Sequence, residues 1–250
     1  MLEIETRNNV RYIICAKDKI KKLGRLVATS NKTKIYQSFS NPKIAYKVYH
    51  KTDSEEKNNL NPSWDRNIKS EHQLIYNLST QQKSVHLTEF PTGIIAFKER
   101  LIGQEIVYYE NFISLDKFAN ENNSSETIFW TPNIYLSMLN ILRELLDNGI
   151  FYEDIRCYNS NFIVLPSTLG APTVKLIDFE NGQVWFVNGR NETEMKDFQS
   201  KIIRDLCSLI NQTNRSFGLF DNNFVFSEMP ESFDKMEEYV NKMNKLLQRR

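Results

Sequence analysis

The stretch that decides the fold lies just past the middle of the chain and reads Gly149-Ile150-Phe151-Tyr152-Glu153-Asp154-Ile155-Arg156-Cys157-Tyr158-Asn159. It carries an acidic residue, Asp154, a basic residue two positions later, Arg156, and an amide five positions later, Asn159. These side chains can converge on a triphosphate. The carboxylate orients a substrate hydroxyl, the cation screens the transferred phosphate, and the amide oxygen holds Mg²⁺. The pattern therefore predicts a site for phosphoryl transfer.

Helices and two short strands are expected around this stretch. A helix precedes it, with Thr131 as the expected N-cap, Pro132 at the first helical position and Gly149 as the C-terminal stop. Its apolar face is formed by residues at helical spacing, namely Ile134, Met138, Ile141, Leu142 and Leu145. The elements expected after the stretch are strands at residues 162–165 and 174–177, and helices at residues 195–210 and 231–247.

The first half of the chain reads mostly as strands. Two hairpins are expected, one around Asn41-Pro42 and one around Gly103, with a helix between them. The expected ranges are strands at 35–39 and 44–49, the helix at 68–78, and strands at 93–101 and 105–109. A strand-rich first half followed by a helical second half belongs to the α+β class.

Two motifs of the second half resemble those of the protein-kinase-like superfamily. Tyr152-Glu153-Asp154-Ile155-Arg156 resembles its His-Arg-Asp or His-Gly-Asp catalytic loop, and Asp178-Phe179-Glu180 resembles its Asp-Phe-Gly metal motif. The resemblance implies a bilobal fold with an antiparallel-sheet N-lobe, residues 1–109, and a mostly helical C-lobe, residues 110–250. It also implies ATP and Mg²⁺ as cofactors, with Asp154 and Arg156 as catalytic residues and Asp178 as a metal ligand.

The first lobe contains a strand that fits this resemblance. Ile44-Ala45-Tyr46-Lys47-Val48-Tyr49 resembles the family's Val-Ala-Ile-Lys strand, in which Ala45 would roof the adenine and Lys47 would contact the α- and β-phosphates. Glu71, on the next expected helix, would be the partner that positions Lys47. The alternatives are an exposed lysine on an edge strand and a solvated glutamate on the helix.

Further ATP-binding positions follow from the resemblance. Ala28, Ser30 and Thr33 stand where the family's phosphate-covering loop has glycines; the two hydroxyls would bind phosphate or act as ordinary turn residues. Backbone groups at Tyr109, Glu110 and Asn111 would bind the adenine edge in the hinge between the lobes. The strand residues Ile163 and Ile177 complete the expected ATP-binding set.

The identity of the metal-binding amide is open between two residues. Asn159 has the family's spacing from Asp154, whereas Asn161 leads directly into an apolar strand, as the family's Asn does. Asp205 resembles the Asp that begins a central helix of the second lobe and braces the catalytic loop. A surface position on the helix is the alternative for Asp205.

The chain is expected to be a compact kinase of bacterial type. No Ala-Pro-Glu motif follows Asp178, and little sequence separates it from Asp205, so a long activation segment has no room. Three short stretches are similar to the YrbL-type family of bacterial regulatory proteins: residues 43–50, 115–119 and 147–150.

Composition gives limits on partners and location. The formal net charge of the 250 residues is +1, which predicts no general attraction to nucleic acid. Three separated cysteines predict neither a disulfide framework nor a metal site. No signal peptide or membrane-spanning segment is expected, so the protein is expected to be cytoplasmic, with secretion into a host as an effector still open.

Three functions are compatible with these features. The first is an ATP-dependent kinase that phosphorylates a hydroxyl of a protein Ser, Thr or Tyr. The second is a kinase of a small molecule or sugar, such as a lipopolysaccharide-core sugar. The third is a pseudokinase that binds nucleotide without turnover, which Tyr152 in place of His and the absent glycines favour.

Overall fold

The computed structural model describes residues 3–16, 18–30, 33–49, 62–82, 84–97, 100–115, 117–118, 125–155, 161–167, 170–179, 183–219 and 224–249. The chain divides into two compact units. The first comprises Met1–Glu110 and Phe179–Asn181, and the second comprises Asn111–Asp178 and Gly182–Arg250. The chain therefore passes from the second unit to the first between Asp178 and Phe179, inside the predicted metal motif.

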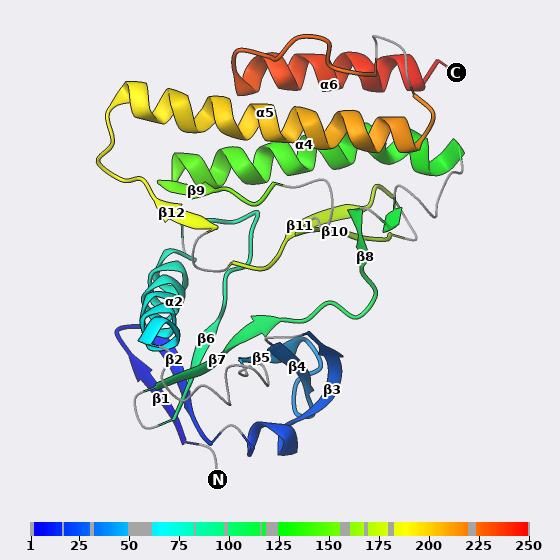
Figure 1. Ribbon diagram of the computed structural model, residues 1–250. Coiled ribbons are helices and arrows are strands. Elements are labelled where there is room, and N and C mark those ends of the chain that lie inside the picture. Colours follow the sequence, from blue (N-terminus) through cyan, green and yellow to red (C-terminus); the bar gives the residue numbers. More distant parts are fainter. Residues whose placement is uncertain are drawn as a thin grey trace. The chain divides into compact units, whose positions relative to one another are not determined.

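The first unit contains, in its described residues, a seven-stranded sheet in the order β1-β2-β6-β7-β5-β4-β3 (Figure 1). Neighbouring strands are antiparallel except β2 and β6, which are parallel. The elements are β1 (Glu3–Arg7), β2 (Val10–Ile14), η1 (Ile20–Lys22), β3 (Gly24–Thr29), β4 (Thr33–Ser38), β5 (Ile44–Tyr49), α2 (Pro62–Gln81), β6 (Gly93–Phe97) and β7 (Arg100–Val107). The hairpin of β4 and β5 and the helix between the hairpins are confirmed; β1 and β2 were not expected.

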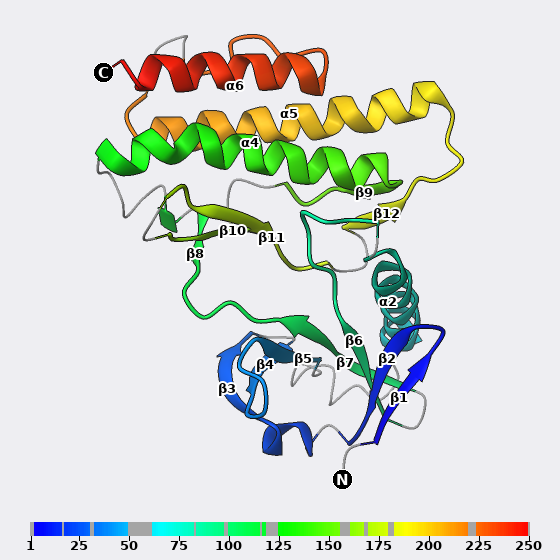
Figure 2. The ribbon, with the colours of Figure 1, turned by 180° about the vertical axis from the view of Figure 1, so that it is seen from behind.

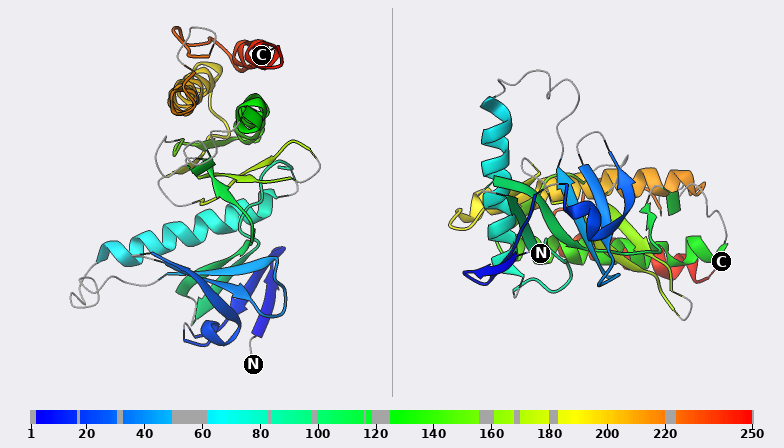
Figure 3. Two further views of the ribbon diagram at one scale, coloured as in Figure 1. Left: turned by 90° about the vertical axis from the view of Figure 1, so that its right-hand side faces the viewer. Right: turned by 90° about the horizontal axis from the view of Figure 1, so that it is seen from below.

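Helix α2 covers one face of this sheet, as Figures 2 and 3 show. Because side chains alternate along a strand, the sheet separates two apolar clusters. One contains Ile75 of α2 with Ile94 of β6, and the other contains Ile95 of β6 with Val48 of β5. Burial on both faces explains why these strands read as nearly continuous apolar runs.

The expected turn at Gly103 is wrong. Gly103 lies inside β7, opposite Val48 of β5 and Ile95 of β6. A methyl group at this position would collide with the main-chain carbonyl of Lys47. Glycine is therefore required here by the close approach of β5, not by a turn.

The described residues of the second unit include three long helices and two small sheets. Helices α4 (Ser125–Asp147), α5 (Glu192–Ser216) and α6 (Phe233–Leu247) lie side by side with similar axis directions (Figures 1 and 3). The strands are β8 (Ile113–Ser114), β9 (Ile150–Tyr152), β10 (Phe162–Leu165), β11 (Thr173–Leu176) and β12 (Val184–Phe186). One sheet has the order β11-β10-β8, and the other pairs β12 with β9. In the described part of the chain, no helix is long and apolar enough to cross a membrane.

The expected start of α4 is wrong, whereas its expected end is confirmed. The helix already begins at Ser125, so Pro132 lies inside it and Thr131 is a buried helical residue. A Thr-Pro pair is typical of a helix start, but Pro is also tolerated within a helix at the cost of one backbone hydrogen bond. At the other end, Gly149 has φ +73°, the left-handed conformation that ends helices.

Candidate functional site

Asp154 lies directly after β9, which pairs with β12. Its Oδ2 atom accepts two hydrogen bonds, one from Asn161 Nδ2 and one from Gln183 Nε2, each 3.0 Å long. An ionised carboxylate only accepts hydrogen bonds, so both amides must present their NH₂ groups to it. Two donors on one oxygen fix the rotamer of the predicted catalytic carboxylate.

Tyr152 occupies the position where the kinase motif has His. Its side chain is fully buried. The hydroxyl accepts a hydrogen bond from Asn161 Nδ2 (2.6 Å) and donates one to the carbonyl oxygen of Asp178 (3.3 Å). One hydroxyl thus connects the end of β9 with a residue just before β10 and a residue just after β11.

Asp178 has a backbone conformation that is rare for residues with a side chain. Its φ is +68°; among the described residues, the other non-glycine residues with positive φ are Asn8 and Asn9, in the turn between β1 and β2. This left-handed conformation costs roughly 1–2 kcal/mol for an L-residue, and less for Asp or Asn. Such strain is typically kept where function needs it. Phe179, which follows, is buried with its ring edge-to-face against Phe90 at 5.1 Å.

Asn161 is the candidate metal-binding amide that the structure describes. Because its Nδ2 atom donates to both Tyr152 and Asp154, its Oδ1 atom is the one left for a cation. Its carbonyl accepts from the Ile177 N–H (2.8 Å), one residue before Asp178. Asn159 and Arg156 lie outside the described residues, so their roles stay predictions.

Oxygen ligands from Asp178 and Asn161 fit Mg²⁺, which prefers carboxylate and carbonyl oxygens. Among the described residues, no group of three or more His, Cys, Asp or Glu side chains is placed to hold a metal. Mg²⁺ at a phosphate site needs only one or two carboxylates, because phosphate oxygens and water complete its coordination. The chemistry of these two oxygen donors is thus compatible with Mg²⁺, and its binding here stays a prediction.

Lys47, Ala45 and Glu71 are all buried in the first unit, with 6%, 0% and 9% of their surface exposed. Lys47 is two residues from Tyr49 on β5, so both side chains leave the same face of the sheet. Tyr49 belongs to the apolar cluster under α2, and its hydroxyl donates to Glu71 Oε1 of that helix (3.2 Å). A buried lysine needs an anionic partner. The alternative of an exposed lysine on an edge strand is excluded, because Lys47 is buried and β5 lies between β7 and β4. The pairing of Lys47 with Glu71 stays a prediction.

The residues predicted to cover the phosphates lie in the hairpin of β3 and β4. Ala28 is exposed on β3, opposite Ile35. Ser30 Oγ contacts Thr33 Oγ1 (2.9 Å), and the Ser30 N–H donates to the Thr33 carbonyl (2.8 Å). Both hydroxyls thus take part in the turn. Their contact with phosphate stays a prediction.

The predicted hinge follows β7. The Tyr108 N–H donates to the Lys43 carbonyl (2.8 Å), and Glu110 and Asn111 are exposed. Burial, with a smaller effect of a hydrogen bond to Glu89, raises the pKa of Tyr109 far above its usual value. Ile163 is buried on β10 and Ile177 is half-buried after β11. Adenine contacts of these residues stay predictions.

Three residues near Asp154 were missed in the sequence. Gln183 precedes β12, Trp185 lies on it, and Lys201 lies on α5. Trp185 Nε1 donates to Glu153 (3.0 Å), and Lys201 forms an ion pair with the same carboxylate. The contacts of Gln183 and Trp185 arise from the pairing of β9 with β12, and that of Lys201 from α5; no local motif indicates either.

Asp205 lies on α5 and is half-buried. Burial raises the pKa of its carboxyl, Arg204 and Lys201 lower it, and Glu153 raises it further. The nearest cation is Arg204, with 3.7 Å between Arg204 Nε and Asp205 Oδ1. Bracing of the catalytic loop by Asp205 stays a prediction.

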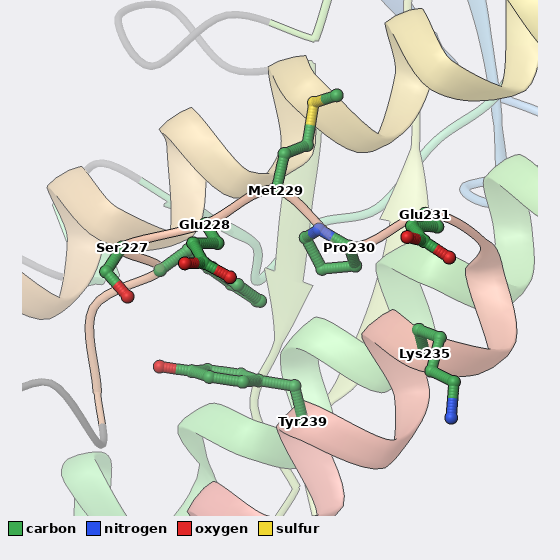
Figure 4. Close-up of a pocket in the computed structure, with 8 residues that line it drawn as sticks. Ser227, Glu228, Met229, Pro230, Glu231, Lys235 and Tyr239 are labelled. Carbon is green, nitrogen blue, oxygen red and sulfur yellow. The ribbon is translucent and has the colours of Figure 1, made fainter.

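A shallow pocket lies between α6 and the loop before it, and no predicted site residue lines it. Tyr239 lies beneath the loop that carries Ser227, Glu228 and Pro230 (Figure 4). Its ring stacks on Phe226 at 4.1 Å, and its hydroxyl donates to the Val225 carbonyl (3.0 Å). These contacts explain Tyr239 as a packing residue.

Solved structures similar to this chain are kinase domains. The kinase domain of Mycobacterium tuberculosis PknI matches with 12% identity and a TM-score of 0.54, over 88% of this chain and 93% of that one. The BubR1 kinase domain matches with 13% identity and a TM-score of 0.51, over 98% of this chain and 88% of that one. No protein-family model and no curated protein matches the sequence. The chain has a protein-kinase-like α+β fold, which confirms the fold expected from its motifs.

Proposed function

We propose that this chain is an ATP-dependent phosphotransferase that moves the γ-phosphoryl group of ATP onto a hydroxyl of a protein Ser, Thr or Tyr. The observation that carries the proposal is the hydrogen-bond network in which Asn161 and Tyr152 link the Asp154 carboxylate to the backbone of Asp178. Positioned carboxylates of this kind are what phosphoryl transfer requires of a protein, because catalysis consists mainly of positioning and charge stabilisation.

Each residue has a defined part in this reaction. Asp154 orients the acceptor hydroxyl and accepts its proton as the new P–O bond forms, while the bond from the γ-phosphorus to the β,γ-bridging oxygen breaks and ADP leaves. Asp178 and Asn161 would hold Mg²⁺, which when bound neutralises charge on the phosphates. Lys47 would bind the α- and β-phosphates, with Glu71 as its partner.

A small molecule or sugar is the second candidate acceptor. The observation that favours it is the short segment between Asp178 and α5, since β12 begins at Val184 and α5 at Glu192. Little sequence is left there to form a platform for a peptide. The two acceptor classes call for separate arms of the experiment.

The test is incubation with Mg²⁺ and γ-labelled ATP, with a cell lysate in one arm and a panel of sugars in the other. Label transfer by the wild type that is lost in Asp154→Ala and in Asp178→Ala supports the proposal. Asp234→Ala, at an exposed position of α6, is the matched control and should keep activity. Nucleotide-induced thermal stabilisation without any transfer would instead identify a pseudokinase.

A further inference from the structure

Gln183 holds the segment that carries Asp154 at two points. Its carbonyl oxygen accepts from the Glu153 N–H (2.8 Å), which extends the pairing of β9 with β12 by one step. Its side-chain Nε2 donates to Asp154 Oδ2 (3.0 Å). One residue therefore binds the main chain before Asp154 and the carboxylate of Asp154 itself.

The neighbouring carboxylate is fixed from the same side. Glu153 accepts from Trp185 Nε1, two residues after Gln183 on β12, and pairs with Lys201 of α5. The Lys201 ammonium also lies 5.4 Å from the centre of the Phe151 ring, a favourable cation–π distance. The segment around Asp154 is thus anchored by the Gln183 main chain, Trp185 and Lys201, which leaves the carboxylate itself as the target of the Gln183 side-chain amide.

We infer that Gln183 is a positioning residue that aims the Asp154 carboxylate at the acceptor hydroxyl. The inference rests on the proposed function and adds a residue that the kinase-like motifs do not contain. Asn161 approaches the same oxygen from β10 and Gln183 approaches it from β12, so the carboxylate is held between the two strands. Without the Gln183 donor this oxygen is held less tightly, and the carboxylate could rotate away from the orientation needed for in-line transfer.

A stabilising role alone does not explain this side chain. The Oε1 atom of Gln183 is buried and has no hydrogen-bond partner among the described residues. A buried unsatisfied acceptor is unfavourable, so an apolar residue of similar size would serve the fold at least as well. An amide at this position is explained by what its NH₂ group does for Asp154.

The kinetic test compares the wild type with Gln183→Leu. We expect kcat to fall about tenfold, because a misoriented catalytic group slows the chemical step. The KM for ATP should stay unchanged, because Asp154 acts on the acceptor. The urea midpoint should change little, because removal of the buried, unpartnered oxygen offsets the lost bond to Asp154. The control is Gln73→Leu on α2, where an exposed amide loses its bond to Asn77. An unchanged kcat, or a change confined to KM for ATP, would overturn the inference.

A second measurement tests the hydrogen bond between Gln183 and Asp154 and does not depend on catalytic turnover. The side-chain ¹⁵N–¹H signals of Gln183, assigned by their loss in Gln183→Leu, should shift in Asp154→Ala and stay in place in Asp234→Ala. Signals that do not respond to Asp154→Ala would refute the inference even if the enzyme is active. A wild type without turnover would overturn the proposed function, and the spectrum would still decide whether Gln183 holds Asp154.

Discussion

The hydroxyl of Tyr152 both accepts and donates a hydrogen bond. A neutral histidine can do the same with its two ring nitrogens, so the Tyr in this kinase-like motif keeps the bonding capacity of the residue it replaces. Tyr152 in place of His therefore does not argue for a pseudokinase. The Tyr side chain is fully buried, so its single hydroxyl must keep both hydrogen-bond partners in place.

We predict that Tyr152→Phe will lower both stability and phosphoryl transfer. Loss of two hydrogen bonds should cost about 1–3 kcal/mol in the free energy of unfolding, because Asn161 and the Asp178 carbonyl each lose a buried partner. Transfer should fall at least about tenfold, since both predicted metal ligands lose a constraint. Urea unfolding and labelled-ATP assays measure the two effects.

The control for this prediction is Tyr135→Phe. Tyr135 is also fully buried, and its hydroxyl donates to Asn214 Oδ1 (2.7 Å). This variant should lose a similar amount of stability and keep its specific activity at a temperature where it is folded. Equal loss of activity in both variants would show that Tyr152 acts through stability alone.

The sequence indicates those site residues whose roles are local, and it misses those that depend on strand pairing. Asp154 and Asp178 are named by their motifs, and Asn161 by the strand that it precedes. Gln183 and Trp185 reach the Asp154 segment only because β12 pairs with β9. The β9 and β12 strands are too short to be read from periodicity.

At the scale of elements, two sequence patterns are each compatible with two local structures, and only tertiary contacts decide which structure forms. Gly103 was read as a turn, yet its missing side chain lets β5 and β7 approach. Thr131-Pro132 was read as a helix start, yet α4 continues through it. The buried apolar positions of α4 were predicted correctly, because their spacing reflects one face of a helix.

We predict that Gly103→Ala will destabilise the first unit by about 1–3 kcal/mol, the usual cost of overpacking. The added methyl would push against the Lys47 carbonyl and displace β5. Nucleotide affinity should fall with stability if Lys47 binds phosphate. Gly170→Ala is the control, because a methyl there meets no atom within 4 Å. Urea unfolding and nucleotide titration of the two variants check this; equal stability of both would contradict it.

We also predict that Asn191→Ala will cost about 1 kcal/mol of stability. Asn191 caps α5, since its side chain accepts from the Glu194 N–H while the Glu194 carboxylate accepts from the Asn191 N–H. Asn191→Asp should keep most of the stability, because a carboxylate caps equally well. Thermal unfolding distinguishes the two; equal loss in both would mean that the capping box contributes little.

At the scale of the whole molecule, each unit closes around its own core. The first unit buries both faces of its sheet, and the second buries the facing sides of α4, α5 and α6. The kinase-like fold was readable from motifs in both halves of the sequence. The hairpin of β1 and β2 was not, because its exposed, charged strand β1 lacks the alternation that marks a strand.

Among the described residues, each unit has one buried cysteine, and the two cysteines give a test of this organisation. Burial raises the pKa of Cys15 to about 11 and that of Cys207 to about 12. The thiolate is the reactive form, and at pH 8 it makes up about a quarter of an ordinary thiol but only about one part in a thousand at a pKa of 11. We predict that iodoacetamide at pH 8 modifies neither residue in the native protein and both in urea, as measured by peptide mass mapping. Because the raised pKa values belong to the folded state, their stabilising effect is complete below the unfolded thiol pKa. It is lost as the pH rises from about 9 to about 11 for Cys15 and to about 12 for Cys207. Native labelling of Cys15 at the rate seen in urea, with Cys207 still protected, would show that the first unit opens without the second.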